Sequence, residues 1–325
     1  MNTITIVAIA TASLLAPVLV SYVVEALRRR PTSSSQSLWG PGVAISHADI
    51  GGIRVRYLKT GSGPNLVLFH TLRTQLEIFQ RVIPKLAEQF TVYAVDYPGH
   101  GWSDIPKAEY SPEDFYRWTE KFLETVDIHD ATVVGVSIGG TIALVLAARQ
   151  NPRVARVIAI NPYDYPPHGG VRSSSMVARL VLGPAGIPIL GATFMRLRNK
   201  FVSGKIMAGG VASADAISPE LGADLFESGE RSGHYQAFLS LLSHEGQWSK
   251  ARHLYPKIKV PTLLIYGEQD WAPGAQREKT AGLIPGVAVK TVSNGSHFLS
   301  LDRPTELSDL IVGFAAPVPA SACAV

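Results

Sequence analysis

Short continuous runs of apolar residues recur along the chain, separated by polar turns and by segments with helical periodicity. An apolar run of five to eight residues is typical of a strand that is covered on both faces. The six runs are Asn65–His70, Thr91–Asp96, Ala131–Val136, Val154–Ile160, Thr262–Tyr266 and Ala288–Val292. Two further segments, Ala44–Ile50 and Ile53–Thr60, flank Gly51-Gly52 and predict a hairpin.

Helical patterns lie between most of these strands. They cover 79–87, Ser111–Val126, with Ser111 as a cap and Pro112 at the favoured first position, and Ile138–Arg149. The alternation predicts an α/β fold with a mostly parallel eight-stranded sheet and helices on both faces. It stops between Asn161 and about Lys257, which indicates an inserted helical cap over roughly residues 165–243.

The N-terminal segment predicts a membrane helix. The segment from Ile4 to Val24 carries no charge, and as a helix it is long enough to cross a hydrocarbon core of about 30 Å. A cleaved signal peptide and a buried helix are the alternatives, but no Lys or Arg precedes the run as it would in a signal peptide. Arg28, Arg29 and Arg30 follow it and favour the cytoplasmic side. We therefore expect a single-pass membrane protein in which the rest of the chain is cytoplasmic.

The expected organisation has four parts. An anchor over 1–30 is followed by a polar tether over 31–43, a globular domain over 44–315 and a small apolar tail over 316–325, expected to be disordered. Apolar residues make up 46% of the chain and charged residues 17%, which excludes a disordered or coiled-coil protein. The net charge of +4 is mostly Arg28–Arg30, so it does not favour nucleic acid as a partner. The single cysteine, Cys323, excludes an internal disulfide and a cysteine-based metal site.

The strongest chemical signal is a G-x-S-x-G motif formed by Gly135, Ser137 and Gly139. It follows a predicted strand and precedes a predicted helix, the context of a nucleophile elbow. The chain must turn sharply there, and a Cβ at either glycine position would collide across the turn. Ser137 would then project at the positive end of the following helix. We interpret it as a nucleophile.

A serine nucleophile needs a base, and the base needs an acid. His297 is the candidate base, because it follows the last predicted strand. Asp270 is the candidate acid, in the loop after the strand Thr262–Tyr266, while Glu268 in the same loop and Asp164 after the preceding strand remain alternatives. The order Ser137, Asp270, His297 is that of α/β-hydrolases.

Further motifs extend this resemblance over roughly Ile45 to Gly313. Asp96–Asp104 is similar to a D-x-P-G-x-G-x-S loop, and Gly295–Phe298 to a histidine loop. With the elbow and the acid loop, they resemble the α/β-hydrolase fold superfamily, in its capped, single-domain serine hydrolase branch. The resemblance implies that the backbone amides of Leu72 and Ile138 form an oxyanion hole.

One position departs from the family pattern. Thr71 stands where the family commonly has a glycine, which leaves open whether the oxyanion hole is preformed. Arg73 beside it is either a partner for an anionic substrate group or a solvated loop arginine.

Together these features predict a serine hydrolase that cleaves a carboxylic ester or related acyl bond of a small apolar substrate, without metal or organic cofactor. Serine at the nucleophile position argues against the epoxide hydrolases and haloalkane dehalogenases, which use aspartate there. The alternatives are a carbon–carbon bond hydrolase of ring-cleavage products, an acyltransferase and a non-catalytic ligand-binding protein.

The cap suggests a second membrane contact. Between Tyr165 and Ala214 there is no Asp or Glu, but there are basic residues among many apolar ones. Such a surface can rest on anionic headgroups. An ordinary cap with solvated charges is the alternative.

Overall fold

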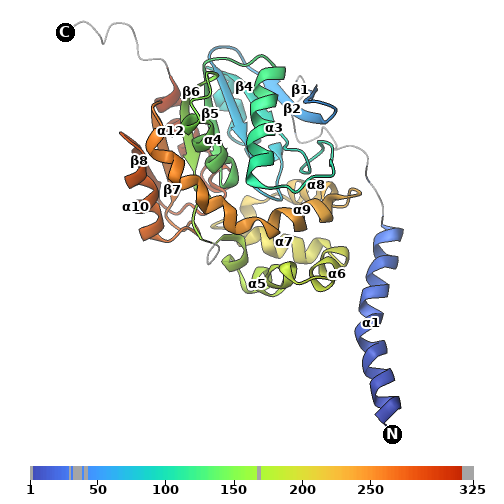
Figure 1. Cartoon of the computed structure of the whole chain (residues 1–325). Coiled ribbons are helices and arrows are strands. Elements are labelled where there is room, and N and C mark those ends of the chain that lie inside the picture. Colours follow the sequence, from blue (N-terminus) through green and yellow to red (C-terminus); the bar gives the residue numbers. More distant parts are fainter. Residues whose placement is uncertain (1–2, 29–30, 32–38, 40–42, 167–169, 317–325) are drawn as a thin grey trace, which may run out of the picture.

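A computed structural model describes residues 3–28, 31, 39, 43–166 and 170–316 (Figure 1). Its sheet has eight strands, which confirms the predicted number. They are β1 (Ala44–Asp49), β2 (Arg54–Thr60), β3 (Asn65–Phe69), β4 (Thr91–Val95), β5 (Ala131–Val136), β6 (Val154–Ile160), β7 (Thr262–Gly267) and β8 (Ala288–Val292).

The strand order is β1-β2-β4-β3-β5-β6-β7-β8. The first two pairs are antiparallel, and the β1–β2 hairpin turns at Gly51 and Gly52, which both have positive φ. All pairs from β4 to β8 are parallel, as expected. The carboxyl ends of β5, β6 and β7 therefore share one edge of the sheet, where the loops that follow them meet.

Two apolar cores cover the two faces of the sheet. One packs α3 (Pro112–Thr125), α4 (Ile138–Ala148) and the 3₁₀ segment η6 (Glu245–Lys257) on one face. The other packs η2 (Leu76–Phe79), α2 (Ile83–Ala87), α11 (Leu299–Asp302) and α12 (Pro304–Ala315) on the opposite face. A further helix, α10 (Gly274–Leu283), joins β7 to β8.

The local helix signals are mostly confirmed. Ser111 caps α3 with a capping box in which Asp114 is the partner, and Pro112 follows at the first position. The prediction of one helix over 79–87 is wrong, because that segment is split between η2 and α2. Pro84 lies in the first turn of α2, where its missing N–H is tolerated.

The cap lies between β6 and β7. It contains α5 (Met176–Leu182), α6 (Leu190–Arg196), α7 (Lys200–Ala208), α8 (Pro219–Ser228) and α9 (His234–Ser243), with 3₁₀ turns at 170–173, 183–186 and 214–216. Its helices have an apolar cluster of their own, built from residues such as Leu182, Met195 and Phe238. Figure 1 shows these helices gathered on one side of the sheet.

The N-terminal segment is helical over α1 (Thr3–Leu27), as its composition predicts. The expected transmembrane helix is not found, however: no helix in the described part of the chain combines the length and apolarity that crossing a bilayer requires. The last turns of α1 contact α6 of the cap, and its polar residues pair there: Ser21 with Arg196, and Glu25 with Arg198.

Three of the expected boundaries cannot be compared with the structure. Positions 1–2 and 29–30 of the anchor, most of the tether (32–38 and 40–42) and the tail over 317–325 lie outside the described residues. The division into anchor, tether, domain and tail stays a prediction.

Candidate active site

Ser137 lies in the sharp turn between β5 and α4. Its backbone is at φ 58° and ψ −117°, a conformation that an L-residue rarely adopts and that the surrounding contacts must hold. Its amide donates to the Ile160 carbonyl at 2.8 Å. A Cβ on Gly135 would overlap the Gly139 carbonyl, and one on Gly139 would lie 2.5 Å from the Phe69 carbonyl oxygen. Both glycines are therefore required by close backbone approach.

The structure brings His297 and Asp270 together. His297 Nδ1 lies 2.6 Å from Asp270 Oδ1, and both side chains are almost fully buried. The amide of Ala272 donates to Asp270 Oδ2 at 3.0 Å, which fixes the carboxylate. Trp271 stacks on the His297 ring with centroids 3.8 Å apart. With Nδ1 facing the carboxylate, the Nε2 atom of His297 is left for another partner.

The two alternative acids have other partners. Asp164 is buried, pairs with Arg252 at 3.1 Å and accepts the Thr280 hydroxyl on both carboxylate oxygens. Glu268 accepts the amide of Asn294 at 2.9 Å in an exposed turn. Of the three carboxylates, Asp270 is the one paired with His297.

Asn161 is a positioning residue that the sequence analysis did not single out. Its side-chain amide donates to the carbonyls of Ser296 and His297, at 3.1 Å and 2.9 Å. Its side-chain oxygen accepts the Gly267 amide at 2.9 Å. Asn161 thus ties the end of β7 to the histidine loop. A buried asparagine directly after β6 was the only available signal.

The expected oxyanion loop follows β3. The carbonyl of Thr71 is held by the His70 ring at 2.7 Å and by the Thr74 hydroxyl at 2.9 Å. His70 Nε2 accepts the Tyr97 amide, so Nδ1 carries the proton and donates it to Thr71. Burial lowers the pKa of His70 to about 3, so the ring stays neutral.

This loop shows how Thr71 replaces glycine. Thr71 does not have a positive φ, so its position does not require a glycine. The residue of this loop with a positive φ is Arg73, at 60°. Among the described contacts, the amides of Leu72 and Ile138 donate no hydrogen bond. Both are therefore available to a ligand.

The Asp96–Asp104 loop is structural. Asp96 accepts the amides of Leu76 and Trp102, each at 2.8 Å, and pairs with Arg56. A Cβ on Gly101 would overlap the Asp96 carboxylate. Burial lowers the pKa of His100 to about 3, and in the described structure no hydrogen bond or ring contact joins it to Ser137, Asp270 or His297.

A cavity of about 700 Å³ adjoins the expected oxyanion loop and the side chain of Trp271. Toward the sheet it is lined by Thr71, Leu72, Trp271 and Phe298, and on the cap side mainly by α7 and α8. Most of the lining is apolar. The cavity therefore has room for an apolar ligand beside the expected oxyanion loop and beside the indole of Trp271 that stacks on His297.

Within the described residues no hydrogen bond joins Ser137 to His297, a contact that is often long before substrate binds. No cluster of three or more metal-binding side chains occurs in the described ranges either. That no metal or cofactor is needed stays a prediction.

The comparisons with known proteins agree with this architecture. The family model described as "alpha/beta hydrolase fold" matches residues 64–183. The chain has the α/β-hydrolase fold, with a cap between β6 and β7.

Among its relatives is 2-(acetamidomethylene)succinate hydrolase from Mesorhizobium japonicum, which is 26% identical over 82% of this chain and 93% of its own. The haloalkane dehalogenase of Mycobacterium marinum is 24% identical over 88% and 98%. The solved structure described as a membrane phospholipase A, a bacterial virulence factor, is 21% identical. It has a TM-score of 0.69 over 96% of this chain and 95% of its own.

Proposed function

We propose that the protein is a serine hydrolase that cleaves a carboxylic ester of an apolar substrate through an acyl-enzyme. The observation that carries the proposal is the buried pair of Asp270 and His297 at the same sheet edge as the strained Ser137 turn. None of the three residues alone would define an activity, but a serine beside a paired histidine and aspartate is the arrangement that activates a serine hydroxyl.

The proposed reaction has two halves. Ser137 Oγ attacks the carbonyl carbon while His297 Nε2 takes its proton, and the amides of Leu72 and Ile138 hold the developing oxyanion. The imidazolium, stabilised by Asp270, returns the proton to the departing alcohol. Water then attacks the acyl-enzyme with His297 as base, which releases the acid and restores Ser137.

The cavity supports an apolar acyl group as the part of the substrate that is bound. It has about 700 Å³ and a mostly apolar wall, which suits an alkyl chain better than a sugar or a peptide. The similar solved structure is described as a phospholipase A, which also fits an acyl ester. Ser137 argues against the chemistry of the related dehalogenase, because that group uses an aspartate nucleophile.

The proposal predicts how activity depends on acyl length. We expect kcat/KM for p-nitrophenyl esters to rise from acetate to decanoate and to vanish in Ser137→Ala. Gly222 lines the cavity, and a Cβ there would make only one ordinary contact, so Gly222→Leu should fill part of the space. It should lower kcat/KM for decanoate relative to butyrate by about tenfold or more, since each buried methylene contributes about 0.8 kcal/mol.

Gly282→Leu is the matched control, because Gly282 is on α10 and has open space around it. The acyl assignment would be contradicted by turnover of a dienoate ring-cleavage product with no ester cleavage, or by acyl transfer to an alcohol without free acid. The first would indicate a carbon–carbon bond hydrolase, and the second an acyltransferase. A site that binds esters without turnover would indicate a binding protein.

We further propose that the protein works at the cytoplasmic face of a membrane, resting on it through α1 and the cap. Except for Val289, every large apolar side chain that is more than a third exposed in the described structure lies on α1 or the cap. Examples are Leu19 (64%), Met176 (79%) and Phe201 (74%). Exposed apolar surface beside basic residues supports contact with anionic lipid headgroups.

A further inference from the structure

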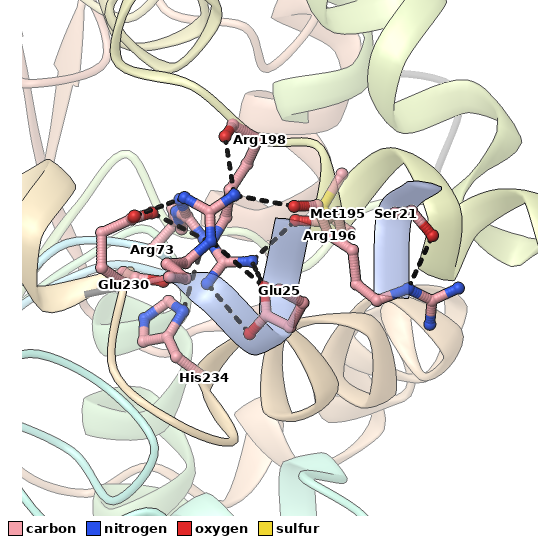
Figure 2. A network of polar contacts seen from close by, with 10 residues as sticks. Ser21, Glu25, Arg73, Met195, Arg196, Arg198, Glu230 and His234 are labelled. Carbon is pink, nitrogen blue, oxygen red and sulfur yellow. Dashed lines mark hydrogen bonds and ion pairs between the residues drawn. The ribbon is translucent and has the colours of Figure 1, made fainter. Parts of the chain in front are cut away.

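Arg73 lies on the cavity wall directly beside the candidate oxyanion amide of Leu72. Both residues line the cavity. Nη1 of Arg73 lies 3.4 Å from His234 Nδ1, and its guanidinium carbon lies 5.2 Å from the centre of the Phe238 ring. Figure 2 shows Arg73 next to His234 and Arg198. A cation is therefore held between the oxyanion loop and the cap, on the surface that a ligand would contact.

Arg73 belongs to a charge cluster between α1, the cap and the oxyanion loop (Figure 2). The cluster contains four arginines and two glutamates: Arg28, Arg73, Arg196, Arg198, Glu25 and Glu230. Both glutamates are already paired. Glu25 binds Arg198 at 2.7 Å and Arg28 at 3.2 Å, and Glu230 binds Arg28 and, at 3.3 Å, Arg198.

The other two arginines have no carboxylate within ion-pair distance among the described residues. Arg196 donates to Ser21 at 2.9 Å and stacks on the Tyr22 ring. His234 adds no charge, because burial and the neighbouring cations lower its pKa well below the usual value and keep the ring neutral. The cluster thus has two positive charges in excess, and of the two unpaired arginines Arg73 is the one that lines the cavity.

Arg73 also remains charged. Burial lowers its pKa to about 10, so the guanidinium is protonated at neutral pH. A desolvated charge that forms no ion pair is unfavourable, and an anion from solution would compensate it. The other charged residues of the cavity wall are Arg198, Lys200 and Lys205, and no Asp or Glu of the described chain lines it.

We propose that Arg73 is a specificity residue that binds an anionic oxygen group, carboxylate or phosphate, on an otherwise apolar substrate. A guanidinium can hold either group with two parallel hydrogen bonds. The apolar remainder of the wall would take the rest of the molecule. The inference depends on the proposed function only in calling the bound amphiphile a substrate.

A direct binding measurement tests the anion site without requiring turnover. Full-length Ser137→Ala protein is titrated with octyl phosphate, octanoate and 1-octanol in a calorimeter. We expect at least one anion to bind about 10- to 100-fold more tightly than the alcohol, as charge-assisted hydrogen bonds predict. This preference should disappear when Arg73→Gln is added. Binding of one anion rather than both would identify the group. Equal affinity for all three compounds would overturn the proposal.

A kinetic comparison separates Arg73 from the field of the whole cluster. The quantity measured is the ratio of kcat/KM for an ester with a terminal carboxylate or phosphate to that for a neutral ester of the same length. The ratio cancels any general effect on the oxyanion loop. We expect it to fall about 10- to 100-fold in Arg73→Gln and less in Arg73→Lys, which keeps the charge.

Arg196→Gln is the matched control, because Arg196 is the other unpaired arginine but does not line the cavity. The ratio should stay unchanged there. An equal fall in Arg196→Gln would show that the summed field acts instead of Arg73 and would overturn the proposal. Anion binding that depends on Arg73, without cleavage of any ester, would contradict the proposed hydrolase and support the site.

Discussion

Asp270 and Asp164 are both buried aspartates that follow neighbouring core strands, and their partners differ. Asp270 faces His297, whereas Asp164 faces Arg252 and Thr280. A carboxylate beside an imidazole can fix its tautomer and stabilise its protonated form. A carboxylate beside a buried arginine balances a charge and holds α10 and η6 to β6. We therefore expect Asp270 to act in catalysis and Asp164 to stabilise the fold.

The two aspartates give opposite expectations for substitution. Asp270→Asn should lower kcat by about 10⁴-fold while leaving the fold intact, because the amide would favour the wrong tautomer of His297. Asp164→Asn leaves Arg252 unpaired and should lower the free energy of unfolding by about 3–5 kcal/mol. Ester hydrolysis and urea denaturation of both variants provide the check. An equal loss of kcat in folded Asp164→Asn would contradict the assignment.

Residues with a local role could be predicted from the sequence alone, whereas the remote partners of Asn161 and Arg73 could not. Gly135 and Gly139 are needed by the turn that contains them, so the motif alone indicates them. Asn161 binds the histidine loop 136 positions away, and Arg73 meets His234 161 positions away. No short motif contains those pairs, and only the folded chain brings them together.

The oxyanion loop is an element whose departure from the family pattern has a simple structural solution. Thr71 keeps an ordinary backbone conformation, while Arg73 takes the left-handed one. His70 and Thr74 hold the Thr71 carbonyl from two sides. The sequence raised the question of a preformed hole, but it could not show these two supports, because the state of the His70 ring depends on Tyr97.

The helix α1 is the element on which the membrane proposal depends most. Leu19 and Val23 are 64% and 57% exposed and lie one turn apart on its surface. Leu19→Ser combined with Val23→Ser should weaken binding to vesicles rich in anionic lipid by about tenfold or more, given the transfer free energy of such side chains. Sedimentation with vesicles measures this effect.

Val289→Ser is its control, since Val289 is equally apolar and 45% exposed but lies on β8. It should leave vesicle binding unchanged. If the unsubstituted protein stays in the supernatant when anionic vesicles are sedimented, the membrane proposal is contradicted.

For the whole molecule, the sequence predicted the sheet far better than the placement of the helices around it. Continuous apolar runs indicated six of the eight strands, because a strand covered on both faces has few polar positions, and the Gly51-Gly52 hairpin indicated the other two. The cap was predicted only from the interruption of that pattern. The docking of α1 on α6 depends on tertiary contacts such as Glu25 with Arg198, which the apolar composition of residues 4–24 conceals.

The central claim is that Ser137 is an activated nucleophile, and labelling with a fluorophosphonate tests it most directly. Full-length protein is treated with the probe, digested, and the modified peptide is mapped by mass spectrometry. We predict a single adduct on Ser137, formed at least 100-fold more slowly in His297→Ala, whose base is missing. An adduct that forms equally fast in His297→Ala, or a folded protein that remains unlabelled with and without added lipid, would contradict the account.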